Sequence, residues 1–164
     1  MEGCCVKGGK FYKLIVARRI YLIAMGVSAS FSYKGLLDMA TRIAVQARID
    51  KLAKDQIENL IGSLYAIDDP KDALLVAQLF AQRQAVRFGK RKGNVIVPCK
   101  AMSEVGETFD NMYNMGKDRV FAAQFLTLVK WIYESMESIE RDELSRINVK
   151  TITFDELMKI LRGR

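Results

Sequence analysis

The segment from residue 121 to residue 139 carries an apolar face that suits a helix and not a strand. Trp131 and Tyr133 lie within it and are expected to be packing residues. Large apolar side chains recur there every three or four residues, at Phe121, Phe125, Leu128, Ile132, Met136 and Ile139. That spacing follows the period of an α-helix, and so wide an apolar surface is expected to be buried between other helices. The segment therefore predicts the central helix of a helical bundle.

Two earlier stretches show the same period. Apolar stripes over 36–47 and 57–65 predict two helices, or one kinked helix. Asp55 and Glu58 resemble a capping box in front of the second stripe. Few strand patterns compete with these helices, and only a short extended piece is expected, over 94–97.

Proline and glycine mark the ends of the remaining helices. Asp69 as N-cap and Pro70 at the first helical position predict a helix that runs to Phe88 and ends at Gly89. Another helix is expected over 98–113, and the sequence TFDE near the C-terminus predicts a capping box before a last one. The expected fold class is all-α, a single-domain helical bundle of about five to seven helices.

A chain of 164 residues is long enough for one compact core. We expect residues 36–164 to form the bundle domain and residues 1–35 to form a helical segment, docked on the body or extended as an arm. The sequence KLIVARRIYLIAMGVSAS resembles a signal peptide. Arg18 and Arg19 interrupt its apolar run, however, which is too short to span a bilayer. No membrane partner is expected.

The side chains that common catalytic and metal sites require are missing or scattered. The chain has no histidine, the usual general base near neutral pH, and none of the common nucleophile or phosphate-loop motifs. Cys4, Cys5 and Cys99 form no C-x-x-C pair, which indicates a reducing, cytoplasmic location. The carboxylates over 134–143 have the spacing of a solvated helix end. We therefore expect a protein that is not an enzyme and has no cofactor and no metal.

Positive charge is gathered into zones instead of being spread evenly. The net charge is +7, and residues 1–54 carry ten Lys and Arg against three acids. Residues 83–100 carry six against none, whereas residues 101–145 are net acidic. Such zones indicate a polyanionic partner. Nucleic acid is the commonest one; an anionic membrane surface and a merely solvated face are the alternatives.

The basic residues of two predicted helices can share one groove if the helices around 36–53 and 70–88 run side by side. The candidate nucleic-acid-binding residues are Arg42, Arg48, Lys51, Arg83, Arg87, Lys90, Arg91 and Lys92. Lys and Arg without accompanying Asn, Gln and aromatic side chains recognise charge and shape and not base sequence. Binding is therefore expected to be independent of sequence and sensitive to salt.

Two stretches of the chain carry a family resemblance. The first has the pattern K/R-x-A-Y/V-x-x-G-K/R, at Arg83, Ala85, Val86, Gly89 and Lys90. The second is an aromatic-rich helix face with Phe125, Leu126, Lys130, Trp131 and Glu134. In this order they resemble the small helical subunit of type III CRISPR interference complexes. The resemblance covers about residues 36 to 140, and the segments before 36 and after 147 depart from the family pattern.

The resemblance implies a non-catalytic structural subunit that stacks in several copies along a guide RNA–target RNA duplex. Its partners would be the backbones of guide RNA and target RNA, other copies of itself and larger subunits of the same complex. An alternative with the same composition is a DNA-wrapping helical coat protein of an archaeal filamentous virus. A free-standing nucleic-acid regulator would need a helix-turn-helix, for which the sequence shows no convincing turn.

Overall fold

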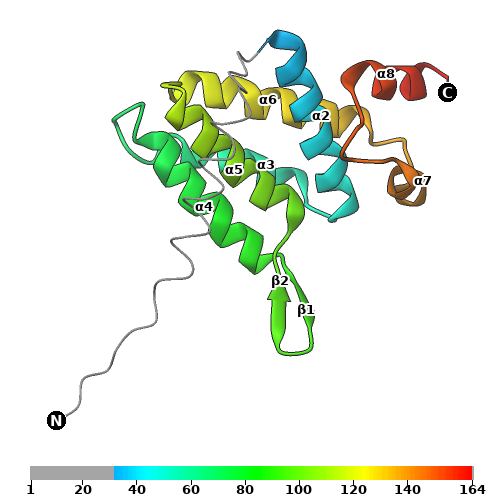
Figure 1. Cartoon of the computed structure of the whole chain (residues 1–164), viewed down its shortest axis with the longest axis horizontal. Helices are drawn as coiled ribbons and strands as arrows, with labels where there is room; N and C mark the ends of the chain where they lie inside the picture. The colour runs from blue at the N-terminus through cyan, green and yellow to red at the C-terminus, as the bar shows by residue number, and fades with distance from the viewer. Residues whose placement is uncertain (1–31, 164) are drawn as a thin grey trace, which may run out of the picture. The chain divides into compact units, whose positions relative to one another are not determined.

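A computed structural model describes residues 32–163 of the chain. The described residues are 67% helical and form seven helices and one small hairpin (Figure 1), which confirms the all-α helical bundle. The predicted N-terminal segment lies outside them up to residue 31, and the first described helix begins at Tyr33. The elements in chain order are α2 (Tyr33–Ile49), α3 (Lys54–Ser63), α4 (Ala73–Arg87), β1 (Lys90–Lys92), β2 (Val95–Val97), α5 (Lys100–Asn114), α6 (Arg119–Ser135), α7 (Arg141–Arg146) and α8 (Phe154–Arg162).

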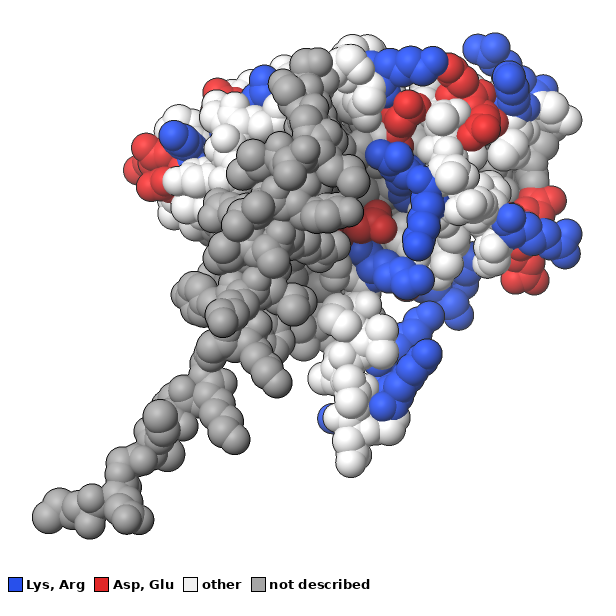
Figure 2. Space-filling view, in the orientation of Figure 1, with Lys and Arg blue, Asp and Glu red and all other residues white. Residues whose placement is uncertain are grey.

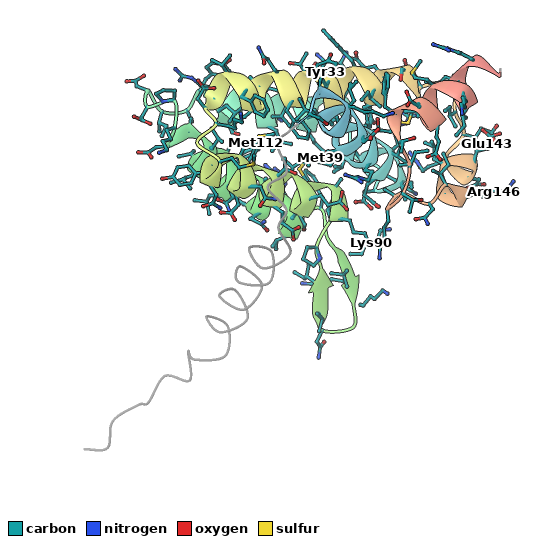
Figure 3. All side chains as sticks on the ribbon, turned by 45° about the horizontal axis from the view of Figure 1, so that its top comes forward. Tyr33, Met39, Lys90, Met112, Glu143 and Arg146 are labelled. Carbon is teal, nitrogen blue, oxygen red and sulfur yellow. The ribbon has the colours of Figure 1, made fainter. Side chains whose placement is uncertain are left out.

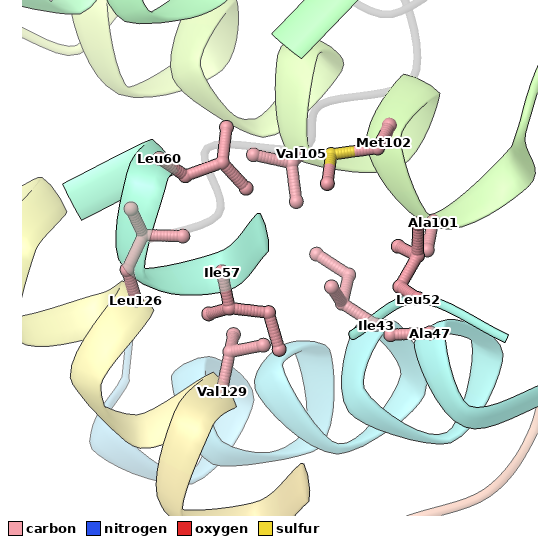
Figure 4. A pocket seen from close by; sticks show the side chains of 10 residues that line it. All are labelled: Ile43, Ala47, Leu52, Ile57, Leu60, Ala101, Met102, Val105, Leu126 and Val129. Atoms are coloured by element: carbon pink, nitrogen blue, oxygen red, sulfur yellow. The ribbon is translucent and has the colours of Figure 1, made fainter. Parts of the chain in front are cut away.

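The core lies where α2, α3, α5 and α6 meet. Helix α6 packs against α2 and α3, and α5 packs against α2 and α4. A small apolar cavity of about 10 Å³ remains between these helices, lined by ten side chains that include Ile57, Met102 and Leu126 (Figure 4). A space of that size has room for at most one water molecule, and its apolar lining offers no hydrogen bond to hold it. The core therefore contains no ligand-sized site.

Helix α6 is the central helix that the apolar periodicity predicts, with differences in detail. Phe125 and Ile132 are buried, whereas Phe121 and Leu128 are only partly covered. The helix ends at Ser135, so Met136 and Ile139, which are also buried, lie beyond it. The Tyr133 hydroxyl donates a hydrogen bond of 2.6 Å to the Leu52 carbonyl, so its packing role is confirmed. The same expectation for Trp131 is wrong, because this side chain points away from the core and is 62% exposed.

The helix-start patterns succeed at α8, fail at α3 and are displaced at α4, which begins at Ala73 with Asp72 as its N-cap, so Asp69 is not the N-cap and Pro70 precedes the helix. Asp69 Oδ1 accepts hydrogen bonds from the N–H groups of Lys71 and Asp72, at 2.9 and 2.8 Å, and so caps the turn that leads into α4. The last helix begins with a full capping box between Thr153 and Glu156. The cap of α3 is mispredicted: Ala53 is the N-cap and the Gln56 side chain accepts from its N–H.

Small side chains allow α4 and α5 to approach closely. One side of α4 consists of four buried alanines, Ala73, Ala77, Ala81 and Ala85. Opposite them, Gly106 of α5 lies so near α4 that an added Cβ would stand 2.5 Å from Nε2 of Gln82. This close pairing fixes the end of α4 beside the start of α5. The segment that connects them therefore extends out of the bundle.

That segment is a β-hairpin that projects from the helices (Figures 1 and 3). Antiparallel pairing sets Lys90 opposite Val97 and Lys92 opposite Val95. The two-residue turn begins at Gly93, whose φ of +60° matches the first position of a type II′ turn. The extended piece expected at 94–97 is therefore present as β2, and the basic run before it is its partner strand.

Candidate nucleic-acid interface

A single carboxylate fastens the end of α2 to the base of the hairpin. Asp50 Oδ2 accepts hydrogen bonds from the Ala101 N–H at 3.0 Å and from the Cys99 thiol at 3.3 Å. Asp50 thus supplies the N-terminal cap of α5 from a distant part of the chain, since Cys99 at the N-cap position makes no side-chain cap. Burial raises the pKa of Cys99 to about 11, so the thiol remains a proton donor at neutral pH.

A second contact brings the end of α4 to the same place, because the Cys99 N–H donates to the Ala85 carbonyl at 2.8 Å. The end of α2, the end of α4 and the start of α5 therefore converge at one end of the bundle. We call this region the cationic end and define it by its seven exposed basic residues, Lys51, Arg83, Arg87, Lys90, Arg91, Lys92 and Lys100.

The residues of the cationic end form no close ion pair with a described carboxylate, although the charge of Lys100 acts on Glu104 of α5. The ion pairs found among residues 32–163 use other lysines, Lys34, Lys54 and Lys130, at N–O distances of 2.7 to 2.9 Å. No residue of the cationic end has a described carboxylate within 4.0 Å. Figure 2 shows basic side chains on the hairpin and on the helical body next to it.

The acid-rich part of the chain lies elsewhere in the bundle. Glu143 and Arg146 are on α7, and Figure 3 shows both well away from Lys90 at the base of the hairpin. The carboxylates of the 134–143 stretch belong to the end of α6 and to α7. The carboxylates of the 134–143 stretch therefore lie apart from the hairpin, whereas Glu104 of the acidic zone lies on α5 and interacts with Lys100 and Arg42.

The route by which the basic zones meet differs from the expected one. Helices α2 and α4 do not pack side by side, because α5 lies against both of them. The alanine side of α4 fits the close approach at Gly106 of α5, which makes α5 its main neighbour. The groove expected between α2 and α4 therefore does not form, and only the ends of the two helices come together.

Arg48 is not part of the cationic end, contrary to the sequence expectation. Its Nη2 donates hydrogen bonds to the carbonyls of Met136 and Glu137, at 3.3 and 3.5 Å. The guanidinium also lies over the ring of Tyr133, 5.1 Å from its centroid. Positive charge at the C-terminal end of a helix offsets the helix dipole. Arg48 therefore caps α6 and stabilises the fold.

Arg42 is half-buried in a surface groove between α2 and α5, unlike the exposed residues of the cationic end. Met39, Thr108 and Asn111 line this groove together with two glutamates, Glu104 and Glu107. Burial raises the pKa of Glu104, the nearby Glu107 raises it further, and the positive charge of Arg42 opposes both. The charge of Arg42 is thus partly used within the protein.

Lys51 adopts a backbone conformation that glycine normally occupies. Its φ is 65°, and it follows the last turn of α2 in a motif closed by a hydrogen bond from the Leu52 N–H to the Ala47 carbonyl, at 3.0 Å. The left-handed conformation costs a residue with a Cβ about 1–2 kcal/mol. A lysine at such a position combines backbone strain with an exposed charge.

Lys100 belongs to the cationic end although it is absent from the candidate set. It is exposed at the first position of α5, directly after the hairpin. The sequence offered one signal, the extension of the acid-free zone to residue 100. The Ala101 N–H donates to Asp50. Because Asp50 precedes Lys51 and Ala101 follows Lys100, this contact brings Lys51 and Lys100 to the same end of the bundle.

Two further kinds of site are not found in the described part of the chain. Residues 32–163 contain no group of three Cys, Asp or Glu side chains placed to hold a metal ion. None of the helices between Tyr33 and Arg162 is long and apolar enough to cross a membrane.

Comparisons of the whole chain with protein-family models, curated proteins and solved structures found no significant match.

Proposed function

We propose that this chain is a non-catalytic nucleic-acid-binding subunit that contacts the phosphate backbone through its cationic end. The observation that carries the proposal is the convergence of seven exposed Lys and Arg side chains with no described carboxylate within 4.0 Å. Cations that the fold does not pair are available to displace counterions from phosphates. Because the set is only Lys and Arg, it recognises charge and shape and not base sequence.

RNA is the proposed ligand, in an assembly of several copies. This choice rests on the resemblance of the stretches around Arg83–Lys90 and Phe125–Glu134 to the small subunit of type III CRISPR complexes. A single cationic end gives modest affinity, and repeated copies along one strand would bind as a multivalent set. Within such a particle, larger subunits would carry any catalytic activity.

The first test is the salt dependence of RNA binding. Replacing Arg83, Arg87 and Arg91 by alanine removes three exposed charges, and each lost phosphate contact on a single strand changes the log–log salt slope by about 0.7. The slope should become flatter by roughly 2 units, with unchanged helix content in circular dichroism. An unchanged slope would remove the cationic end from the binding site.

A matched triple variant controls for net charge. Arg141, Arg146 and Lys150 are also exposed and lie around α7, away from the hairpin. Alanine at these three positions removes the same charge and is expected to leave the slope nearly unchanged. Equal effects of the two triple variants would show that overall charge, and not the cationic end, attracts RNA.

The second test concerns the ligand and the assembly. The full chain is purified under low salt from its native source, and the bound nucleic acid and proteins are identified. A guide RNA with larger partner subunits supports the proposal. A homogeneous assembly on duplex DNA would overturn it in favour of the coat-protein alternative.

A further inference from the structure

We propose that the outer side of α4 is an interface with α4 of a second copy of this chain, in antiparallel orientation. Three large apolar side chains on this side are exposed, Leu75 at 39%, Leu79 at 71% and Val86 at 53%. With Gln82 they have the spacing i, i+4, i+7, i+11, so all four lie along one stripe of the helix. The stripe extends over about 16 Å of helix.

Helix α4 is apolar on two opposite sides. Its inner side, formed by the alanines from Ala73 to Ala85, is already buried against α5. The outer side of a surface helix normally carries polar residues, whereas this one carries leucine and valine. No described element covers these side chains. A row of exposed large apolar residues at helical spacing is typical of a protein–protein interface.

The charges at the two ends of α4 select a second copy as the occupant. Exposed Asp68, Asp69 and Asp72 precede the stripe, whereas Arg83, Arg87 and the basic strand β1 accompany or follow its last turns. Two antiparallel copies of α4 place each acidic end beside the basic end of the other copy. A parallel pair would instead bring like charges together. The surface is therefore complementary to itself about a two-fold axis.

The register follows from the spacing of the stripe. Antiparallel pairing centred between Leu79 and Gln82 sets Leu75 opposite Val86 of the other copy and Leu79 opposite its Gln82. In this register Asp72 lies beside the segment from Arg87 to Lys90 of the other copy. The Gln82 side chain reaches toward α5, where an added Cβ on Gly106 would stand 2.5 Å from its Nε2, so it lies at the edge of the apolar seam.

Sedimentation equilibrium of the full chain tests the interface, at concentrations from about 1 μM to about 1 mM, the range for a small interface. The wild-type chain should dimerise. Leu79→Gln should weaken the dimer about tenfold or more, because each dimer contains the change twice. Val120→Gln is the matched control, since Val120 is 55% exposed on α6, and it should not affect the dimer. A wild-type chain that stays monomeric, or a Leu79→Gln dimer of unchanged affinity, would overturn the proposal.

Charge reversal tests the orientation. Asp72→Arg should weaken the dimer severalfold at low salt, and the double variant with Arg87→Asp should regain most of the lost affinity, because it exchanges the two charges. Asp72 makes no side-chain cap, so its replacement removes no capping hydrogen bond. An unchanged or stronger Asp72→Arg dimer would exclude the antiparallel arrangement.

The proposed interface shares Arg87 and Lys90 with the cationic end, so RNA binding is measured at protein concentrations at which the chain is monomeric. Leu79→Gln changes no charge, so it should leave the salt slope of RNA binding by the monomer unchanged. A wild-type chain that dimerises but does not bind RNA would count against the proposed function alone.

Discussion

The basic residues of α2 and those around the hairpin look alike in the sequence but have different surroundings in the fold. Arg48 donates to two carbonyls at the end of α6, and Arg42 shares a groove with Glu104. Arg87 and the basic strand β1 are exposed and have no described carboxylate within 4.0 Å. The difference shows that a positive residue is available to a ligand only when the fold itself has no use for its charge.

Position relative to helix ends explains much of this contrast. Arg48 lies where α2 passes the C-terminal end of α6, and backbone carbonyls there accept its hydrogen bonds. The hairpin projects beyond the helices, so its cations contact neither helix ends nor the acid-rich α7 (Figure 3). The cationic end thus depends on the short hairpin that projects from the bundle.

The largest expected effect that separates the two sets is on stability. Arg48→Ala removes charged hydrogen bonds, a helix-end charge and a contact with Tyr133, and should lower the free energy of unfolding by about 2 kcal/mol. Arg83→Ala, which removes an exposed arginine from α4, should change it by less than about 0.5 kcal/mol. Urea denaturation followed by circular dichroism measures both. Equal stability of the two variants would contradict the assignment of Arg48 to the fold.

Lys51 sharpens the comparison because it is both strained and exposed. Lys51→Gly relieves the left-handed conformation but adds freedom to the unfolded chain, and a net gain of about 0.5 kcal/mol is expected. Lys51→Ala keeps the strain and removes the same charge. Both variants should flatten the RNA salt slope by about 0.7. Equal stability of the two variants would argue against strain, and an unchanged slope would place Lys51 outside the RNA contact.

The smallest expected effect concerns the carboxylate beside Arg42. The folded-state pKa of Glu104 is raised, so its ionisation destabilises the fold at neutral pH and has no effect below about pH 4, where the residue is protonated in both states. Glu104→Gln should therefore raise Tm at pH 7, and this advantage should disappear as the pH falls to 4. Glu107→Gln on the exposed side of α5 should give a smaller gain. A Tm difference that does not change with pH would refute this account.

Local patterns predicted the helices well because each helix carries its own signals. Periodic apolar residues located α2, α3 and α6, and Asp69 with Gly89 bounded the α4 region. The cap of α3 was misplaced because Asp55 suits a cap in composition, although Ala53 with Gln56 supplies it. The packing role expected for Trp131 is wrong because a helix with a wide apolar surface is not covered on every side. The apolar character of a side chain does not indicate which side stays exposed.

The hairpin shows the limit of the same approach. The apolar triplet at Val95–Val97 was recognised as extended, but its partner is a run of three cations that has no strand pattern of its own. Pairing is decided by the Gly93 turn and by the neighbouring helix ends. The acid-free zone included Lys100, but no local pattern could place it near Lys51, since 49 residues separate them.

By itself, the sequence determined that this chain is helical, that its charge is concentrated in zones, and that it lacks histidine, because composition and short-range periodicity are properties of the chain. Only the tertiary structure decided which cations are available. That outcome depends on contacts between residues far apart in the chain, such as Asp50 with Ala101 and Arg48 with the end of α6. Hydrogen-bond partners at this separation are chosen by the packing of whole helices, and no local pattern encodes them.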